Sequence, residues 1–292
     1  GLAVSMDSNL YGAIDPYVSG AYATAESIRN VISVGARPIA LTDCLNYGNP
    51  EKPSVFFDFE QGVDGIKDAA EKLSFIDGDP VPIVSGNVSF YNESKQGAAI
   101  IPSPVVMCVG KLESYYHSLT MQCKYPDETV IIIGKRHAEF GGTQIKNQIS
   151  ELNAVAPQVR YDDEAAQNKA IHHLINNRLL SSCHDISMGG VWSAICEMIL
   201  GERGHIKAGM EIQIPEKIST IAYLFSENGG YVITCSNDKI DDVVNELDKR
   251  KINYYKGGKT TRSKGVVIKK GSNVLVNIKG NTLLDRWNSS KR

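Results

Sequence analysis

The chain has 292 residues, and its 31 Lys and Arg residues nearly balance its 33 Asp and Glu residues, which leaves a formal net charge of −2. This balance lacks the basic excess that is typical of general nucleic-acid-binding proteins. A hydrophobic content of 42% with 22% charged residues indicates a folded globular chain and excludes a disordered one. At roughly 150 residues per domain, two domains are expected.

The six cysteines are scattered singly, and the chain contains no C-x-x-C pair and no H-x-x-x-H spacing. This pattern predicts neither a disulfide framework nor a zinc site, and it fits a reducing, cytoplasmic compartment. The longest mostly apolar stretch, residues 98–109, contains two prolines and is too short to span a bilayer. The chain starts without Met and without a signal-peptide pattern, so we expect it to be a piece of a longer protein.

The first part of the chain predicts a strand, a helix and a second strand in succession. Apolar residues alternate over residues 2–7, which predicts a strand with one buried face. Asp15 before Pro16 is typical of a helix N-terminus, and the following apolar spacing predicts a helix up to Gly35. An apolar run at 38–42 predicts a buried strand that ends at Asp43. The further elements predicted here are a helix at 54–73, a turn at 77–80, and strands at 81–85, 98–101 and 104–109.

A polar stretch at residues 112–127 predicts a domain boundary, which divides the chain into residues 1–120 and 121–292. Both parts mix strands and helices with hairpin-like connections, and this favours an α+β fold over a doubly wound parallel sheet. The elements predicted for the second part are helices at 142–148, 164–180, 189–200 and 240–249, and strands at 129–133, 231–235, 253–256, 265–270 and 272–278.

Two polar segments follow predicted strands and are the main functional candidates. Residues 42–51, TDCLNYGNPE, place two carboxylates, two carboxamides and a glycine within ten residues. The ends of strands hold side chains on a rigid support, where ligand contacts are common. The alternative is an ordinary polar turn, because Asn, Gly and Pro form turns in their own right.

The second segment is SGNVSFYNE at residues 85–93. Gly86 lets the backbone approach a bound group closely, and the amide oxygen of Asn87 is a hard ligand of the kind that Mg²⁺ accepts. Ser89 points to the same side as Asn87 if the chain stays extended. The alternative is a strand-to-hairpin connection whose polar side chains bond to one another.

Other candidates have structural explanations of similar or greater weight. Residues 139–144, EFGGTQ, are predicted to open a helix whose free N–H groups suit an anion, although a glycine turn explains them equally well. His184 and Asp185 are either an acid–base pair or part of a capped helix start. Cys44 has no accompanying base and is better explained as a small buried residue.

Together, DCLNYGNPEK and SGNVSFYNE resemble the paired motifs in the second half of the phosphoribosylformylglycinamidine synthases, the amidine-forming enzymes of purine biosynthesis. Shorter matches occur in the order found in that family, at residues 14–17, 102–106, 139–142 and 184–187. The resemblance extends from the first residue to about residue 235 and more faintly beyond. It implies an aminoimidazole-ribonucleotide-synthetase-like N-terminal domain, whose sheet pairs with that of a like domain, followed by a C-terminal α+β domain of the same superfamily.

The resemblance also implies an ATP-dependent ligase that activates the amide of formylglycinamide ribonucleotide as an iminophosphate, which ammonia derived from glutamine then converts to the amidine. By position, Asp43 and Gly86 resemble ATP contacts, Asn87 a Mg²⁺ ligand and Ser89 a contact to the ribonucleotide substrate. The cofactors implied are ATP and Mg²⁺. No catalytic residue is expected in this half, because the family's histidine base belongs to the first half. Met188 stands where the family pattern leads us to expect aspartate.

We therefore expect half of a composite synthetase that is inactive alone. The expected partners are the missing N-terminal half, a glutaminase subunit, a small accessory subunit and, for the isolated chain, a second copy. The alternatives are a catalytically silent nucleotide-binding half and another ATP-using member of the superfamily. All of these expectations require Asp43 and Asn87 to face one common pocket.

Overall fold

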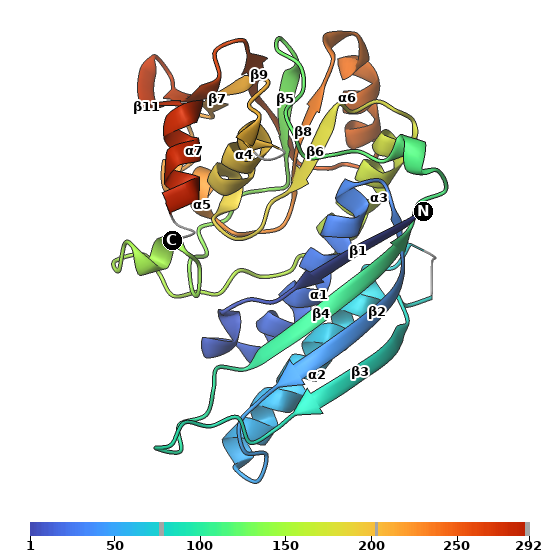
Figure 1. Cartoon of the computed structure of the whole chain (residues 1–292), viewed down its shortest axis with the longest axis vertical. Helices are drawn as coiled ribbons and strands as arrows, with labels where there is room; N and C mark the ends of the chain where they lie inside the picture. The colour runs from blue at the N-terminus through green and yellow to red at the C-terminus, as the bar shows by residue number, and fades with distance from the viewer. Residues whose placement is uncertain (76–78, 202–203, 290–292) are drawn as a thin grey trace.

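The computed structural model describes residues 1–75, 79–201 and 204–289. Within them the chain forms two β-sheets with associated helices, an N-terminal sheet below and a C-terminal sheet above in Figure 1. The expected α+β fold is therefore confirmed. The elements of the first part are β1 (Leu2–Asp7), α1 (Pro16–Ser33), β2 (Arg37–Asn46), α2 (Pro53–Lys72), β3 (Ile83–Ser89) and β4 (Ser103–Lys111).

The N-terminal sheet has four strands in the order β1-β4-β2-β3. β4 runs antiparallel to both β1 and β2, and β3 runs parallel to β2. The carboxyl ends of β1, β2 and β3 therefore lie at one edge. α1 begins as predicted, with the Asp15 carboxylate accepting a hydrogen bond from the N–H of Val18 and Pro16 in the first turn.

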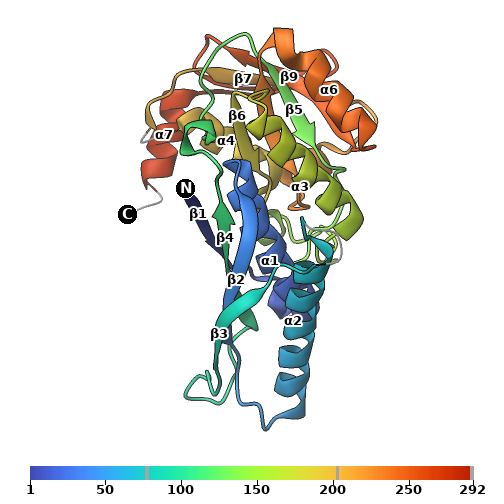
Figure 2. The same ribbon diagram turned by 90° about the vertical axis from the view of Figure 1, so that its right-hand side faces the viewer.

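Helices cover only one face of this sheet. Figure 2 shows α1 and α2 on one side of the four strands and the other side open. The prediction for residues 2–7 was correct for the strand and wrong for its apolar face, because Leu2, Val4 and Met6 are 72%, 61% and 66% exposed. The smaller alternate residues, such as Ala3, face α1, which packs closely against the strand. Within the described residues, an apolar sheet surface is thus left without a covering layer.

The C-terminal sheet has seven strands in the order β11-β10-β7-β9-β5-β8-β6. Its elements in chain order are β5 (Thr129–Ile133), α3 (Tyr161–Asn176), β6 (Ser182–Asp185), α4 (Gly190–Leu200), β7 (Gly209–Ile214), α5 (Thr220–Phe225), β8 (Tyr231–Cys235), α6 (Ile240–Lys249), β9 (Tyr254–Thr261), β10 (Gly265–Lys270), β11 (Asn273–Lys279) and α7 (Gly280–Ser289). No helix among the described residues is both long enough and apolar enough to cross a membrane.

The two sheets share one hydrophobic core. Ile28 and Ile32 of α1 belong to the same buried cluster as Ile131 of β5 and Leu174 of α3. A buried ion pair between Arg29 of α1 and Glu164 of α3 lies in the same contact. The second sheet therefore packs directly on the helix layer of the first.

Several predicted elements differ from the structure. The strand predicted at 98–101 is absent apart from a single bridge between Glu93 and Ala99, and the helix predicted at 142–148 is only a short 3₁₀ turn at Ile145–Asn147. The first half of the turn predicted at 77–80 lies outside the described residues. The prediction missed β6, β7, α5 and α7.

Candidate functional site

The two polar segments lie side by side because β2 and β3 are neighbouring parallel strands. Asp43 lies opposite Gly86, and Asn46 lies opposite Ser89. The prediction that both segments are loops was wrong for their first halves, since β2 continues to Asn46 and β3 to Ser89. In these first halves, the backbone N–H and C=O groups of β2 and β3 bond to each other across the strand pair, so they need no local turn to satisfy them.

Beyond the strands, the loops that follow β2 and β3 are bonded to each other. The Tyr47 N–H donates to the Ser89 carbonyl at 3.0 Å, and the Tyr91 N–H donates to the Gly48 carbonyl at 2.9 Å. The Lys52 ammonium pairs with the Glu93 carboxylate at 2.5 Å. The two motifs, some forty residues apart in sequence, therefore form one structural unit at the carboxyl edge of the sheet.

The Asp43 side chain lies directly beside Gly86. A Cβ atom at Gly86 would lie 2.5 Å from Asp43 Oδ1, so a side chain there would require the carboxylate to move. The carboxylate also accepts a hydrogen bond from the Asn87 backbone N–H, which lowers its pKa, but desolvation is the larger effect and the net shift is upward. The glycine thus makes room for the chain's own carboxylate.

Asn87 and Ser89 occupy the opposite face of the sheet. Successive side chains of a strand alternate between faces, so Asn87 lies on the uncovered face while Asp43 lies on the helix-covered one. The expectation that the side chains of Asp43 and Asn87 face one common pocket is therefore wrong, because the sheet itself lies between them. The Ser89 hydroxyl is held by the Asn92 carboxamide, whose Nδ2 lies 3.1 Å from Ser89 Oγ.

The described residues do not assemble a metal site by themselves. They contain no group of three or more His, Cys, Asp or Glu side chains placed to hold an ion. Asn87 can offer one amide oxygen from the uncovered face, and Mg²⁺ often takes only one or two protein ligands beside phosphate and water. Any further protein ligand there would have to come from whatever covers this face.

His184 and Asp185 lie on β6, at the contact between the two sheets, rather than at a helix start. His184 Nδ1 lies 3.0 Å from Asp185 Oδ1, and its Nε2 lies 2.8 Å from Glu197 Oε2 of α4. Burial lowers the pKa of the imidazole, but its hydrogen bonds and charge interactions with these two carboxylates outweigh burial and raise the pKa to about 10. A histidine that is protonated at neutral pH is not a general base.

We expect the stability of this chain to fall between about pH 6.5 and pH 10 through His184. Because its folded-state pKa lies above the unfolded value of 6.5, its contribution is complete below pH 6.5 and is lost as pH rises through the folded value. Urea unfolding across this range should show the decline, and His184→Gln should remove most of it. Wild type and variant declining in parallel would assign the loss to other groups.

Glu227 is a buried carboxylate with a structural role that the sequence analysis missed. Its Oε2 accepts the Tyr11 hydroxyl at 2.7 Å, and its Oε1 accepts the N–H groups of Gln144 at 2.8 Å and Gly189 at 2.9 Å. The carboxylate is 2% exposed and joins a turn after β1 to two loops of the C-terminal part. The EFGGTQ segment is accordingly a glycine turn tied to Glu227 and not an open anion site.

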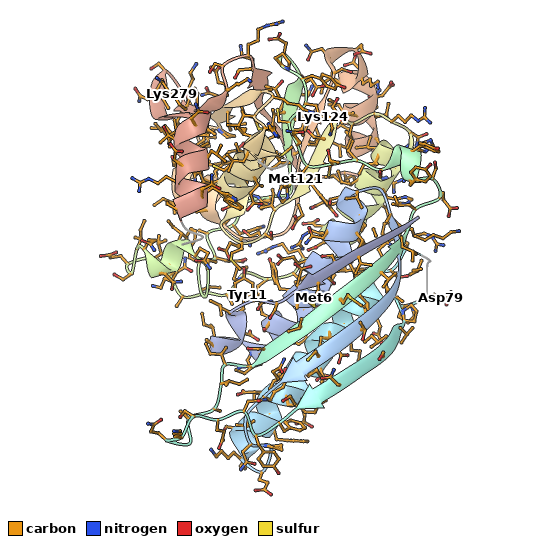
Figure 3. The ribbon with its side chains drawn as sticks, viewed as in Figure 1. Met6, Tyr11, Asp79, Met121, Lys124 and Lys279 are labelled. Carbon is orange, nitrogen blue, oxygen red and sulfur yellow. The ribbon has the colours of Figure 1, made fainter. Side chains whose placement is uncertain are left out.

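The larger cavities lie away from the paired motifs. A cleft of about 650 Å³ separates the start of β1 from the His184 region, and a second of about 520 Å³ lies between α4 and α7. Met121 lines both, and Figure 3 places it between the two sheets. Neither cavity is lined by Asp43, Gly86, Asn87 or Ser89.

The two-sheet fold with motif strands β2 and β3 defines a class of protein. Residues 1–112 match the family described as AIR synthase related protein, N-terminal domain, and residues 126–271 match AIR synthase related protein, C-terminal domain. The chain therefore belongs to the AIR synthase related family.

Within this class the chain is similar to phosphoribosylformylglycinamidine synthase subunit PurL. It is 36% identical to the PurL of Methanothrix thermoacetophila over 298 aligned residues, which cover 100% of this chain and 38% of that protein. Two solved structures of Thermotoga maritima PurL, complexed with ATP and with FGAR, each give a TM-score of 0.76 over 97% of this chain, at 18% and 17% identity. These alignments cover 44% and 45% of those chains, so this chain spans less than half of each of these PurL relatives.

Proposed function

We propose that this chain forms part of an ATP-dependent amidine-forming ligase of purine biosynthesis, which converts formylglycinamide ribonucleotide, ATP and ammonia to the amidine, ADP and phosphate. The observation that carries the proposal is the union of the two motifs on neighbouring strands, with their polar residues at one edge of the sheet. The similarity to PurL over the whole chain supports the same reaction class.

The uncovered face of the N-terminal sheet supports a composite site. Asn87 and Ser89 lie on the same face as the exposed Leu2, Val4 and Met6. In our proposal a second sheet of the same kind packs on this apolar surface and closes a nucleotide site around its polar edge. Asn87 then supplies one oxygen ligand to the Mg²⁺ that accompanies ATP, and the Ser89 hydroxyl contacts the ribonucleotide.

Asp43 has a different role in this arrangement. Its carboxylate lies against the Gly86 backbone and holds the Asn87 N–H, so it fixes the strand from which Asn87 and Ser89 project. Asp43 and Gly86 contact ATP only if the bound nucleotide extends to the carboxyl ends of β2 and β3. The proposed protein partners are the segment of the synthetase that this chain lacks, a glutaminase subunit and a small accessory subunit.

The function is tested by mixing the chain with the separately produced segment of the Methanothrix relative that it does not cover. We expect ammonia-dependent ADP release from the mixture and none from either part alone. Asn87→Ala should reduce this rate at least tenfold, whereas Asn273→Ala, an exposed asparagine on β11, should leave it unchanged. Turnover by the isolated chain would refute the composite site. A mixture that associates but neither binds nor hydrolyses ATP would favour a silent structural half.

If a second sheet covers the apolar face of the N-terminal sheet, the isolated chain should pair with a second copy of itself. Because Leu2, Val4 and Met6 are exposed together, we expect the isolated chain to be a dimer at micromolar concentration. Val4→Lys places a charge at the centre of that face and should give a monomer with a native circular dichroism spectrum. Sedimentation equilibrium checks both states, and a monomeric wild-type chain would contradict the pairing.

A further inference from the structure

Positive charge is concentrated in the last part of the chain. Residues 249–284 contain ten Lys and Arg residues and no Asp or Glu. Residues 249–292 carry thirteen basic residues and one acidic residue, a formal net charge of +12, which leaves −14 on residues 1–248. The near-neutral total therefore conceals two regions of strong opposite charge.

Four of these thirteen basic residues lie on one sheet face. Met210 and Ile212 of β7 and Val266 and Ile268 of β10 point into the core beneath α4, so the alternate residues of these strands point the other way. Strand register places four lysines on this outward side: Lys256 and Lys259 of β9, Lys269 of β10 and Lys279 of β11. We call these four residues the lysine face. Figure 3 shows Lys279 at the far end of the C-terminal sheet from Met6 and Tyr11.

The charges of the lysine face are largely uncompensated. Lys269 pairs with Glu211 at 2.9 Å. Lys256, Lys259 and Lys279 are exposed, and within the described part of the chain they have no ion pair at 4 Å or less. Like charges on adjoining strands repel one another, so this arrangement costs stability unless a ligand of opposite charge offsets it.

Protection of an edge strand does not explain the pattern. Lysines on an exposed edge prevent strand-to-strand aggregation, and this accounts for Lys279 on β11. Lys256 and Lys259 lie on β9, which is paired on both sides by β5 and β7 and has no free edge. Edge protection therefore does not account for Lys256 and Lys259.

We propose that the lysine face docks an acidic segment of a partner protein. This proposal is independent of the ligase function. Lysine ammonium groups act as point charges that attract carboxylates without a fixed geometry, and all four residues of this face are lysine. The aromatic ring that β9 places on this side, Tyr254, is half-buried and bonds through its hydroxyl to Asp248 at 3.1 Å, so it offers no free platform for a base.

The charge of the rest of the molecule also favours a short protein segment. An extended polyanion such as duplex DNA, or a charged vesicle, would approach the acidic body of residues 1–248 as well as the lysine face. At physiological salt the Debye length is about 8 Å, so a short acidic segment responds to the lysine face alone. The preferred partner is therefore short as well as acidic.

The test measures fluorescence anisotropy of a labelled glutamate-rich peptide of about twelve residues, titrated with the whole chain at low and at physiological salt. We expect binding that weakens as salt rises. The double variant Lys256→Glu, Lys279→Glu should raise the Kd at least tenfold, as expected for reversal of charges facing a complementary partner. The matched control Lys67→Glu, Lys95→Glu changes the net charge equally at exposed sites far from the face and should bind as wild type does.

A second variant, Lys256→Gln with Lys279→Gln, removes the charges without introducing repulsion, and it keeps the test valid if the glutamate variant folds poorly. It should also weaken binding, by a smaller factor. Equal binding by the face and control variants overturns the proposal, as does absence of peptide binding at low salt. Tighter binding of duplex DNA or of phosphatidylserine vesicles than of the peptide overturns it in favour of those polyanions.

Discussion

Replacement of Arg29 by methionine is expected to lower the free energy of unfolding by about 3–5 kcal/mol, the range measured when one partner of a buried ion pair is removed. The Arg29 side chain is 0% exposed and pairs with Glu164, whose side chain is 6% exposed. Methionine fills a similar volume but leaves the Glu164 carboxylate buried without its cation. Since native domains are stable by only about 5–15 kcal/mol, this loss is a large fraction of the total.

Arg29 also neutralises more than one carboxylate. The charges of Asp185 and Glu26 act on it as well as that of Glu164, and together they raise the pKa of Arg29 in spite of its burial. Burial and the neighbouring Asp185 raise the pKa of Glu26 to about 8 even with the cation in place. The stability lost by Arg29→Met relative to wild type should therefore be larger at pH 8 than at pH 6, because low pH protonates the carboxylates it leaves unpaired.

The matched control for Arg29 is Arg262→Met. Arg262 forms a surface ion pair with Asp127 at 3.0 Å and its side chain is 81% exposed, so its loss should cost about 0.5 kcal/mol. Urea unfolding at pH 6, 7 and 8 measures both variants. The double variant Arg29→Met, Glu164→Gln should recover part of the loss. Equal, small effects at the two arginines would show that the buried pair does not join α1 to α3 energetically.

The sequence predicted correctly those features that depend only on residues close together in the chain. The start of α1 follows from Asp15 and Pro16, which act on their own helix. The exposed face of β1 did not follow, because alternation specifies a strand with two different faces but not which face meets the core. Which face of β1 is buried depends on tertiary structure. α1 packs against the small side chains of the strand, and no described layer covers its large ones.

In the candidate site, too, the sequence predicted what depends on neighbouring residues and missed what depends on residues far away in the chain. The two motifs could be recognised from residue types, but their continuation as strands depends on pairing between β2 and β3, some forty residues apart. The helix predicted at 142–148 does not form there. Gly142 adopts a positive φ of 74°, and the Gln144 N–H is taken by Glu227, which lies 83 residues away. No local signal marks such a contact.

Replacement of Glu227 by alanine is expected to lower the free energy of unfolding by about 3 kcal/mol, since it leaves the Tyr11 hydroxyl and two backbone N–H groups without their acceptor. Glu227→Gln should cost about 1 kcal/mol or less. Burial raises the pKa of Glu227 more than its three hydrogen bonds lower it, so the folded state favours the neutral carboxyl relative to an exposed one. A neutral amide can keep both N–H bonds and turn its own NH₂ toward Tyr11.

Tyr11→Phe isolates the bond between the two parts of the chain, because it removes one donor and leaves the bonds from Gln144 and Gly189 in place. We expect it to cost about 1 kcal/mol.

Glu60, an exposed residue of α2, provides the control for the Glu227 variants, and its alanine and glutamine variants should both lie within about 0.5 kcal/mol of wild type. Urea unfolding gives the energies, and limited proteolysis shows whether the loops at 139–144 and 186–189 open. Equal destabilisation by Glu227→Gln and Glu227→Ala would contradict this account, because it would mean that the negative charge, rather than the geometry of the acceptor, holds the three segments together.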